Sequence, residues 1–173
     1  VEAIDRVKTT AASHSRCMII ETMGRHCGDL AIFGALAGGV EVLSTPEVKL
    51  TEDQIIKEIS DARNKGLKRE IITLVTEGMY DINALSKKVE KQTGIVTRPL
   101  ILSNLQRGGV PSSRDRILAS RMGVFAVEEL IAGKQGIAIC SVNGEMVSKD
   151  IMKAIAEKQP DRKGLIKVVK MTS

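Results

Sequence analysis

The sequence predicts an α/β fold, with a mostly parallel sheet and helices on both of its faces. Short runs of β-branched residues alternate along the chain with amphipathic stretches of helical length, which is the order of strand–helix–strand units. Glycines and capping residues separate the two kinds of segment. Hydrophobic residues make up 43% of the 173 residues and charged residues 27%, as in a globular domain.

Five apolar runs are predicted as strands. Each is short and rich in isoleucine, valine or leucine, and each is followed by glycine or by polar residues of the kind that form turns. In chain order they are residues 17–21, 40–43, 71–75, 100–102 and 136–142.

The helices are recognised by their ends and by their apolar spacing. The chain opens in a helical pattern at residues 1–5, and another helical stretch covers 29–39. Apolar residues three or four positions apart give each helix one face for the core, as with Ile55 and Ile59. The expected amino-terminal caps are Thr51 (in a capping box with Gln54), Asp81, Ser112 (with Asp115) and Ser148. The expected carboxyl-terminal stops are Gly66, Gly94 and Gly133.

Charge and composition argue against several classes of function. The formal net charge of +5 fits anionic ligands, but basic residues alternate with Glu and Asp, and aromatic residues make up only 2%, which disfavours stacking on nucleic-acid bases. No apolar run approaches the about 20 residues that a membrane helix needs. Three cysteines without metal-ligand spacing fit buried thiols in a reducing cytosol. We therefore expect a cytoplasmic protein that binds neither nucleic acid nor membrane.

Three of the predicted strands end in residues that suit a phosphorylated polyol. Ligands of open parallel sheets lie at the carboxyl ends of the strands. There the sequence places residues 23–25 (Met-Gly-Arg), 77–78 (Glu-Gly) and 106–109 (Gln-Arg-Gly-Gly). Glycine lets backbone N–H groups approach an anion beside the guanidinium fork of arginine, and a carboxylate accepts hydrogen bonds from sugar hydroxyls. The residues alone therefore indicate two anion sites and one hydroxyl acceptor.

Several short motifs follow one another along nearly the whole chain. They are Ser13-His14-Ser15-Arg16, residues 21–29 (ETMGRHCGD), Ala37-Gly38-Gly39, Pro46-Glu47, Thr76-Glu77-Gly78, residues 106–109 and residues 115–121 (DRILASR). Together they resemble the bacterial-type ATP-dependent 6-phosphofructokinase family. The resemblance implies that family's fold and, in the whole enzyme, transfer of the γ-phosphoryl group of ATP to fructose 6-phosphate in glycolysis, with Mg²⁺ as cofactor and fructose 1,6-bisphosphate as product. It also implies a homo-oligomer, expected to be a tetramer.

The resemblance assigns substrate contacts within one subunit. Met23, Gly24, Glu77 and Arg107 would contact fructose 6-phosphate. Arg25 would lie beside the transferring phosphoryl group and stabilise its developing charge, which makes it the one expected catalytic residue in this chain.

Further substrate contacts are implied between subunits. Arg16 and Arg98 would reach the 6-phosphate of a neighbouring subunit's substrate. Asn104 stands where the family usually has a histidine beside that phosphate. Because asparagine donates a hydrogen bond but carries no charge, the site would depend more strongly on the two arginines.

A second group of residues resembles the effector site of the allosteric members. Its members are Lys8, Gly39, Glu41, Lys65 and Lys68, and the expected effectors are ADP or phosphoenolpyruvate. Glu41 would help to hold the effector's magnesium. Lys8 stands where an arginine is usual, which removes the bidentate fork. Leu67 resembles a one-residue insertion, so the choice between Lys65 and Lys68 stays open.

The same resemblance divides the chain into two parts. Residues 1–107 resemble the smaller, sugar-phosphate domain, and residues 108–173 resemble a return segment that packs on an ATP-binding domain. That domain's glycine-rich phosphate loop has no counterpart in this sequence, and neither does the aspartate pair that supplies the base and a magnesium ligand. With the missing initial Met, this predicts a piece of the enzyme that is inactive alone and that leaves most ligands of the catalytic Mg²⁺ elsewhere.

Two other functions stay open. A pyrophosphate-dependent relative would share the sugar-phosphate site, although Asp29 favours ATP because many pyrophosphate users have tryptophan there. A noncatalytic sugar-phosphate-binding or assembly module is the third possibility.

Overall fold

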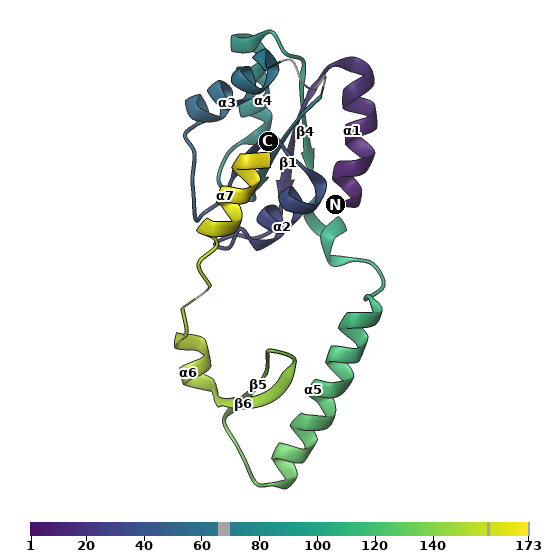
Figure 1. The fold of residues 1–173 in the computed structure, drawn as a ribbon, viewed down its shortest axis with the longest axis vertical. Coiled ribbons are helices and arrows are strands. Elements are labelled where there is room, and N and C mark those ends of the chain that lie inside the picture. The colour runs from purple at the N-terminus through teal and green to yellow at the C-terminus, as the bar shows by residue number, and fades with distance from the viewer. Residues whose placement is uncertain (66–69, 159, 173) are drawn as a thin grey trace. The chain divides into compact units, whose positions relative to one another are not determined.

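A computed structural model describes residues 1–65, 70–158 and 160–172, and it divides the chain into two compact units (Figure 1). Unit 1 comprises Val1–Gly108 and Asp161–Ser173, and unit 2 comprises Gly109–Pro160. The sequence had suggested one continuous segment after residue 107. The last helix instead belongs to unit 1, because its residues Ile166 and Val169 are buried in that unit's core.

Unit 1 is built around a four-stranded parallel sheet, as the sequence predicted. Its strands are β1 (Cys17–Thr22), β2 (Val42–Ser44), β3 (Ile71–Thr76) and β4 (Thr97–Ile101). They lie in the order β2-β3-β1-β4, so β1 and β3 are central, and β4 is an edge strand that tolerates Pro99. The register places Cys17 beside both Ile71 and Thr97.

Helices cover both faces of this sheet (Figure 1). They are α1 (Glu2–His14), α2 (Asp29–Gly38), α3 (Glu52–Asn64), α4 (Ile82–Thr93) and α7 (Lys163–Thr172), with a short 3₁₀ helix η1 (Ser103–Arg107) after β4. One core layer, which includes Ile55, Ile59 and Leu85, packs α3 and α4 on the sheet. The other layer, which includes Ile32 and Ile166, packs α1, α2 and α7 on the opposite face.

The predicted helix caps of unit 1 are confirmed where the structure describes them. Thr51 and Gln54 form the reciprocal capping box of α3. The side chain of Asp81 accepts hydrogen bonds from two backbone N–H groups of α4, and Gly94, at φ 71°, ends that helix. The expected stop at Gly66 lies outside the described residues.

Unit 2 contains α5 (Ser113–Ile131), β5 (Ile137–Val142), β6 (Glu145–Asp150) and α6 (Ile151–Ala156). The capping box of Ser112 with Asp115 is confirmed. The fifth predicted strand exists, but it pairs antiparallel with β6 and is not in the parallel sheet. The reason is a two-residue turn at Asn143-Gly144, where both residues have positive φ. The predicted cap at Ser148 is therefore wrong: Ser148 lies in β6, and Asp150 caps α6.

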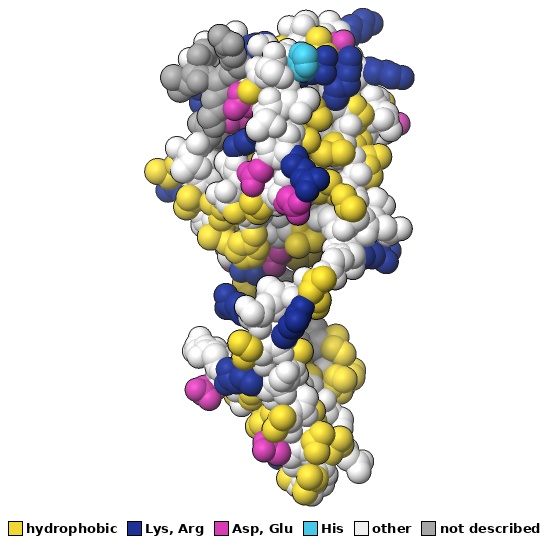
Figure 2. All heavy atoms as spheres, turned by 90° about the vertical axis from the view of Figure 1, so that its right-hand side faces the viewer, with side chains coloured by type: hydrophobic (Ala, Val, Ile, Leu, Met, Phe, Trp, Pro, Cys, Tyr) yellow, Lys and Arg dark blue, Asp and Glu magenta, His cyan; other side chains and the backbone are white. Residues whose placement is uncertain are grey.

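Unit 2 has little apolar core of its own. Among its described residues, 109–158 and 160, none is buried. In Figure 2, hydrophobic side chains are visible on the surface of this unit, and α5 contributes exposed large ones. They are Ile117, Val124, Val127, Leu130 and Ile131. A hollow of about 360 Å³ beside Val124, Phe125 and Met146 continues this apolar surface.

The sequence predicted no membrane-spanning helix. In the described part of the chain, no helix combines the length and the apolar character needed to cross a bilayer.

Candidate functional site

The carboxyl ends of three strands meet at one edge of the unit 1 sheet. After β1, the backbone N–H of Met23 donates to Gln106 Oε1 at 2.7 Å, and the N–H of Gly24 donates to Glu77 Oε1 at 3.2 Å. Glu77 follows β3, and Gln106 lies in η1, which follows β4. The structure therefore brings Met23, Gly24, Glu77 and the 3₁₀ helix that carries Asn104 and Arg107 to the same edge.

The residues after β1 form a tight turn, which we call the Gly24 loop (residues 23–28). Gly24 has φ 157°, and a Cβ there would collide with the backbone oxygen of Cys27 and lie 2.9 Å from Thr76 Cγ2. Cys27 N–H closes the turn on Gly24 O at 2.8 Å. Arg25 has φ 50°, a left-handed conformation that a residue with a side chain rarely adopts, and it is exposed. Such strained positions concentrate at ligand sites and need support from their surroundings.

The far end of the Gly24 loop is held from two directions. Gly28 N–H donates to Glu47 Oε1 at 2.8 Å, and a Cβ on Gly28 would collide with Glu47 Oε2 and lie 2.6 Å from Thr45 Cβ. The next residue, Asp29, begins α2 and receives two hydrogen bonds of 2.8 Å from the guanidinium of Arg162. These hydrogen bonds lower the pKa of Asp29 below its ordinary value.

Two carboxylates lie close together at the same edge. Burial raises the pKa of Glu21 above its usual value, and the negative charge of Glu77 raises it further, while a backbone hydrogen bond from Gly78 acts in the opposite direction. A pair of carboxylates repels phosphate but accepts hydrogen bonds from hydroxyl groups. This part of the edge therefore suits the sugar portion of a sugar phosphate.

The 3₁₀ helix η1 presents the remaining predicted contacts of this edge. Asn104 and Arg107 are both exposed, whereas Gln106 is partly buried because its side chain accepts from Met23. Arg25, after β1, and Asn104 and Arg107, after β4, are thus exposed polar residues in segments that follow the strand ends, and such side chains can bind an anion.

An apolar hollow of about 370 Å³ lies beside this edge, between the start of α1, α2 and η1. Thr22 and Gln106 line it together with Ile4, Leu30 and Phe33, among others. Among its lining residues, which all fall in the described part of the chain, none has a charged side chain. The hollow therefore does not suit a phosphate group.

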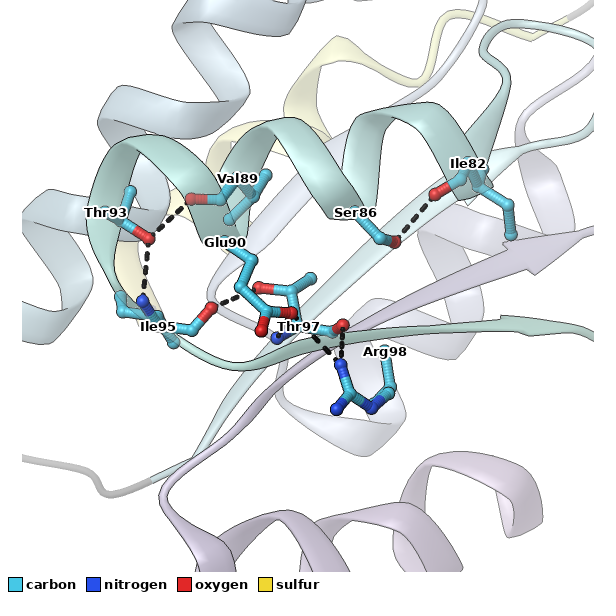
Figure 3. Close-up of polar contacts among 8 residues, drawn as sticks. All are labelled: Ile82, Ser86, Val89, Glu90, Thr93, Ile95, Thr97 and Arg98. Carbon is cyan, nitrogen blue, oxygen red and sulfur yellow. Dashed lines mark hydrogen bonds and ion pairs between the residues drawn. The ribbon is translucent and has the colours of Figure 1, made fainter.

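Arg16 and Arg98 lie at the opposite edge of the sheet. Arg16 immediately precedes β1, and Arg98 is the second residue of β4, so both stand at amino ends of neighbouring strands. Arg98 Nη1 donates to Glu90 Oε2 and to Thr97 O, each at 3.0 Å, and Glu90 Oε2 also accepts from Thr97 N–H at 3.2 Å (Figure 3). Within one chain, the structure does not bring these two arginines to the Gly24 loop.

The predicted effector residues are partly gathered at that amino-terminal edge. The amine of Lys8 donates to Gly38 O and lies beside Gly39, where α2 ends. Glu41 precedes β2, and its Oε2 accepts from Ile72 N–H at 2.8 Å.

The structure does not decide between the two lysines that the sequence left open. Lys65 is exposed at the carboxyl-terminal cap of α3. Lys68 lies outside the described residues.

The described residues were compared with the ligand groups that metal ions need. No group of three or more His, Cys, Asp or Glu side chains with metal-binding geometry occurs among the described residues. Magnesium is commonly held by one or two carboxylates together with phosphate oxygens and water. Glu41 is therefore compatible with a metal that arrives with a nucleotide.

The sequence did not indicate three residues that shape the candidate site. Gln106 was part of a quoted motif, yet its role in holding Met23 N–H depends on how η1 docks. Glu47 likewise belonged to a motif without an assigned role. Arg162 lies 133 residues from Asp29 along the chain, so no local pattern could connect the two.

Comparisons with known proteins agree with this geometry. The Phosphofructokinase family model matches residues 1–130. The chain is 48% identical over 166 residues to the ATP-dependent 6-phosphofructokinase of Photobacterium profundum, covering 95% of this chain and 52% of that protein. It is 46% identical over 169 residues to the enzyme of the same name from Aliivibrio salmonicida, covering 97% and 52%. The chain thus spans about half the length of the curated relatives it matches.

Solved structures resemble the fold as well. The phosphofructokinase of Saccharomyces cerevisiae superposes with a TM-score of 0.80 at 29% identity, over 90% of this chain and 22% of that chain. Pichia pastoris phosphofructokinase in the T-state superposes with a TM-score of 0.77 at 31% identity, over 90% and 19%. Sequence motifs, strand-end geometry and both kinds of likeness agree, and the chain belongs to the phosphofructokinase family.

Proposed function

We propose that this chain supplies the sugar-phosphate site of an ATP-dependent 6-phosphofructokinase, which transfers the γ-phosphoryl group of ATP to fructose 6-phosphate. The observation that carries the proposal is the convergence of Met23, Gly24 and Glu77 with η1 at the carboxyl edge of the sheet, through the hydrogen bonds from Met23 and Gly24 N–H. Open parallel sheets bind their ligands at this edge.

The residues of this edge would have separate tasks. Glu77 accepts hydrogen bonds from sugar hydroxyls and also holds Gly24 N–H. Arg25 lies in the strained part of the loop that follows β1, and its side chain can reach over a transferring phosphoryl group. A guanidinium there stabilises charge that shifts in the transition state. Arg107 and Asn104 bind the 6-phosphate end of the substrate.

Arg16 and Arg98 would act on the substrate of a neighbouring subunit. Their position at the opposite edge of the sheet supports this, because one chain cannot direct them at its own Gly24 loop. Glu90 would orient the Arg98 fork, and Arg98 is still about half exposed, with 52% of its side chain accessible. In the full-length protein, subunits with Arg98→Ala mixed with subunits with Arg107→Ala should recover some activity. Hybrids as inactive as either parent would show that each site is built within one chain.

Other parts of the enzyme would complete the catalytic site and regulate it. The donor, the catalytic base and most ligands of the catalytic Mg²⁺ would come from a nucleotide-binding part of the protein. The exposed apolar surface of α5 supports the idea that unit 2 packs on that part. A tetramer in the cytoplasm, with ADP or phosphoenolpyruvate bound near Lys8, Gly39 and Glu41, would complete the regulated enzyme.

Turnover by the full-length protein tests the proposal and separates it from its alternatives. The assay couples fructose 1,6-bisphosphate formation to NADH oxidation, with ATP or with pyrophosphate as donor. We expect ATP-dependent turnover that Arg107→Ala abolishes and that Lys88→Ala, which breaks a remote ion pair with Glu52, leaves intact. Turnover with pyrophosphate alone would identify the pyrophosphate-dependent enzyme. Binding of fructose 6-phosphate without turnover from either donor would indicate a noncatalytic module.

A further inference from the structure

The first carboxylate of α2 has a partner from the end of the chain. Arg162 Nε donates to Asp29 Oδ1 and Arg162 Nη2 donates to Asp29 Oδ2, both at 2.8 Å, so the two planar groups meet in a bidentate pair. The same guanidinium lies 5.3 Å from the centre of the Phe33 ring, one helical turn further along α2. Arg162 therefore contacts α2 at two places, the carboxylate of Asp29 and the ring of Phe33.

This pair is better protected than a typical surface ion pair. The side chain of Arg162 is 22% exposed and that of Asp29 is 33% exposed, whereas Arg6 and Glu2 are 79% and 81% exposed. Exposed pairs contribute little because water screens them and mobile side chains must be ordered. A planar fork on a partly shielded carboxylate loses less on both counts. The Arg162–Asp29 contact is thus able to fix a backbone position.

The position that it fixes is the end of the Gly24 loop. Asp29 directly follows Gly28, whose N–H is held by Glu47, and Gly28 follows Cys27, whose N–H closes the turn on Gly24. The loop contains Arg25 at φ 50°, and such a conformation persists only where neighbouring contacts hold it. Arg162 supplies a contact from outside the sheet, because it reaches the loop from the start of α7.

We propose that Arg162 is a positioning residue, which holds the Gly24 loop through Asp29 so that Gly24 stays on Glu77 and Arg25 faces the substrate. The inference rests on the function proposed above and extends it to the carboxyl-terminal segment. Arg162 touches neither substrate nor reacting atoms. It acts through Asp29 on the backbone that carries them.

Kinetics of the full-length protein test the positioning role. Misplacing catalytic groups by about 1 Å costs up to about 100-fold, so Arg162→Ala should lower kcat/KM for fructose 6-phosphate by at least about tenfold, with changes in both kcat and KM. Arg162→Lys keeps the positive charge but loses the guanidinium fork, so its kcat/KM should lie between those of the parent protein and Arg162→Ala. The double variant Arg162→Ala with Asp29→Asn should be no worse than the poorer single variant, because both changes remove the same contact.

The matched control is Lys88→Ala, which removes an ion pair to Glu52 and Asp53 on the other face of the sheet. It should leave kcat/KM unchanged, as would any variant that affects stability alone while the protein stays folded. Unchanged kcat/KM in folded Arg162→Ala protein overturns the proposal.

Amide hydrogen exchange gives a second readout that does not require turnover. In Arg162→Ala protein, the peptide that spans residues 23–29 should exchange about tenfold faster than in the parent, since one charged contact no longer opposes local opening. Lys88→Ala should leave that peptide unchanged. If the full-length protein phosphorylates nothing, the proposed function fails by itself. Faster exchange would then still support the loop contact, and unchanged exchange would refute it.

Discussion

Replacement of Glu77 by glutamine and by alanine separates its two contacts. In the structure, Glu77 Oε1 accepts from Gly24 N–H at 3.2 Å. In the proposed function, the same carboxylate also accepts hydrogen bonds from the sugar hydroxyls. Glu77→Gln keeps a carbonyl oxygen for Gly24 but removes the charge. Glu77→Ala removes the acceptor as well, so the two variants differ in whether the Gly24 loop is still held.

The expected sizes follow from the kinds of hydrogen bond involved. A bond to a charged group contributes about 1.5–3 kcal/mol and a neutral one about 1 kcal/mol, so the loss of charge in Glu77→Gln costs about 1.4 kcal/mol. This corresponds to an increase of about tenfold in KM for fructose 6-phosphate, with kcat largely kept, because the hydroxyls change little during transfer. Glu77→Ala also leaves Gly24 N–H unpaired, at a further about 1–3 kcal/mol. Since Arg25 follows Gly24, kcat should fall too.

Saturation kinetics on the full-length protein, with fructose 6-phosphate varied at fixed ATP, measure both constants for each variant. Carboxyl chemical shifts followed against pH provide an independent check. Removing the charge of Glu77 should bring the pKa of Glu21 part of the way back toward its usual value, because burial, the larger cause of the rise, remains. A Glu77→Gln variant that lowers only kcat, or an alanine variant indistinguishable from it, would refute the division of roles.

Two further predictions concern pH. Burial raises the pKa of the Cys17 thiol from 9.0 to about 12. The unfolded chain therefore loses this proton first, and the free energy of unfolding should fall by up to about 4 kcal/mol as pH rises from 9 to 12. Urea unfolding should show a shallower alkaline loss for Cys17→Ala, and equal slopes would contradict the assignment. Asn104→His should tighten fructose 6-phosphate binding at pH 6 and lose the gain by pH 8, as imidazole with a pKa of about 6.5 loses its charge. Titration calorimetry at both pH values measures this, and an affinity unchanged at both would remove residue 104 from the phosphate site.

Elements with a local signature were predictable from the sequence. The capping box at Thr51 and the cap at Asp81 involve residues within three positions of one another, and the central strand β3 is a largely apolar run because both its faces are buried. The gathering of residues 23–25 and 77–78 at one edge was also predictable, because the carboxyl ends of neighbouring parallel strands share an edge of the sheet.

The rest depends on contacts that local patterns do not contain. β6 (Glu145–Asp150) is polar and half-exposed, so its sequence lacks the apolar run of a core strand, although Asn143-Gly144 was a usable turn signal. Residues 163–172, which form α7, were assigned by resemblance to the return segment without a helix of their own, and their burial in unit 1 appears only when the chain is folded. The pair of Arg162 with Asp29 is of the same kind.

The place of α7 in the chain has a consequence for folding during synthesis. Unit 2 is inserted between Gly108 and Asp161, so unit 1 is discontinuous in sequence. The ribosome must complete unit 2 before Ile166 and Val169 exist to fill the core layer on the α2 face. Until then the nascent sheet has one face incompletely covered, and Asp29 has no arginine. If Arg162 has the proposed positioning role, the Gly24 loop can reach its final geometry only after unit 2 and residue 162 have been synthesised.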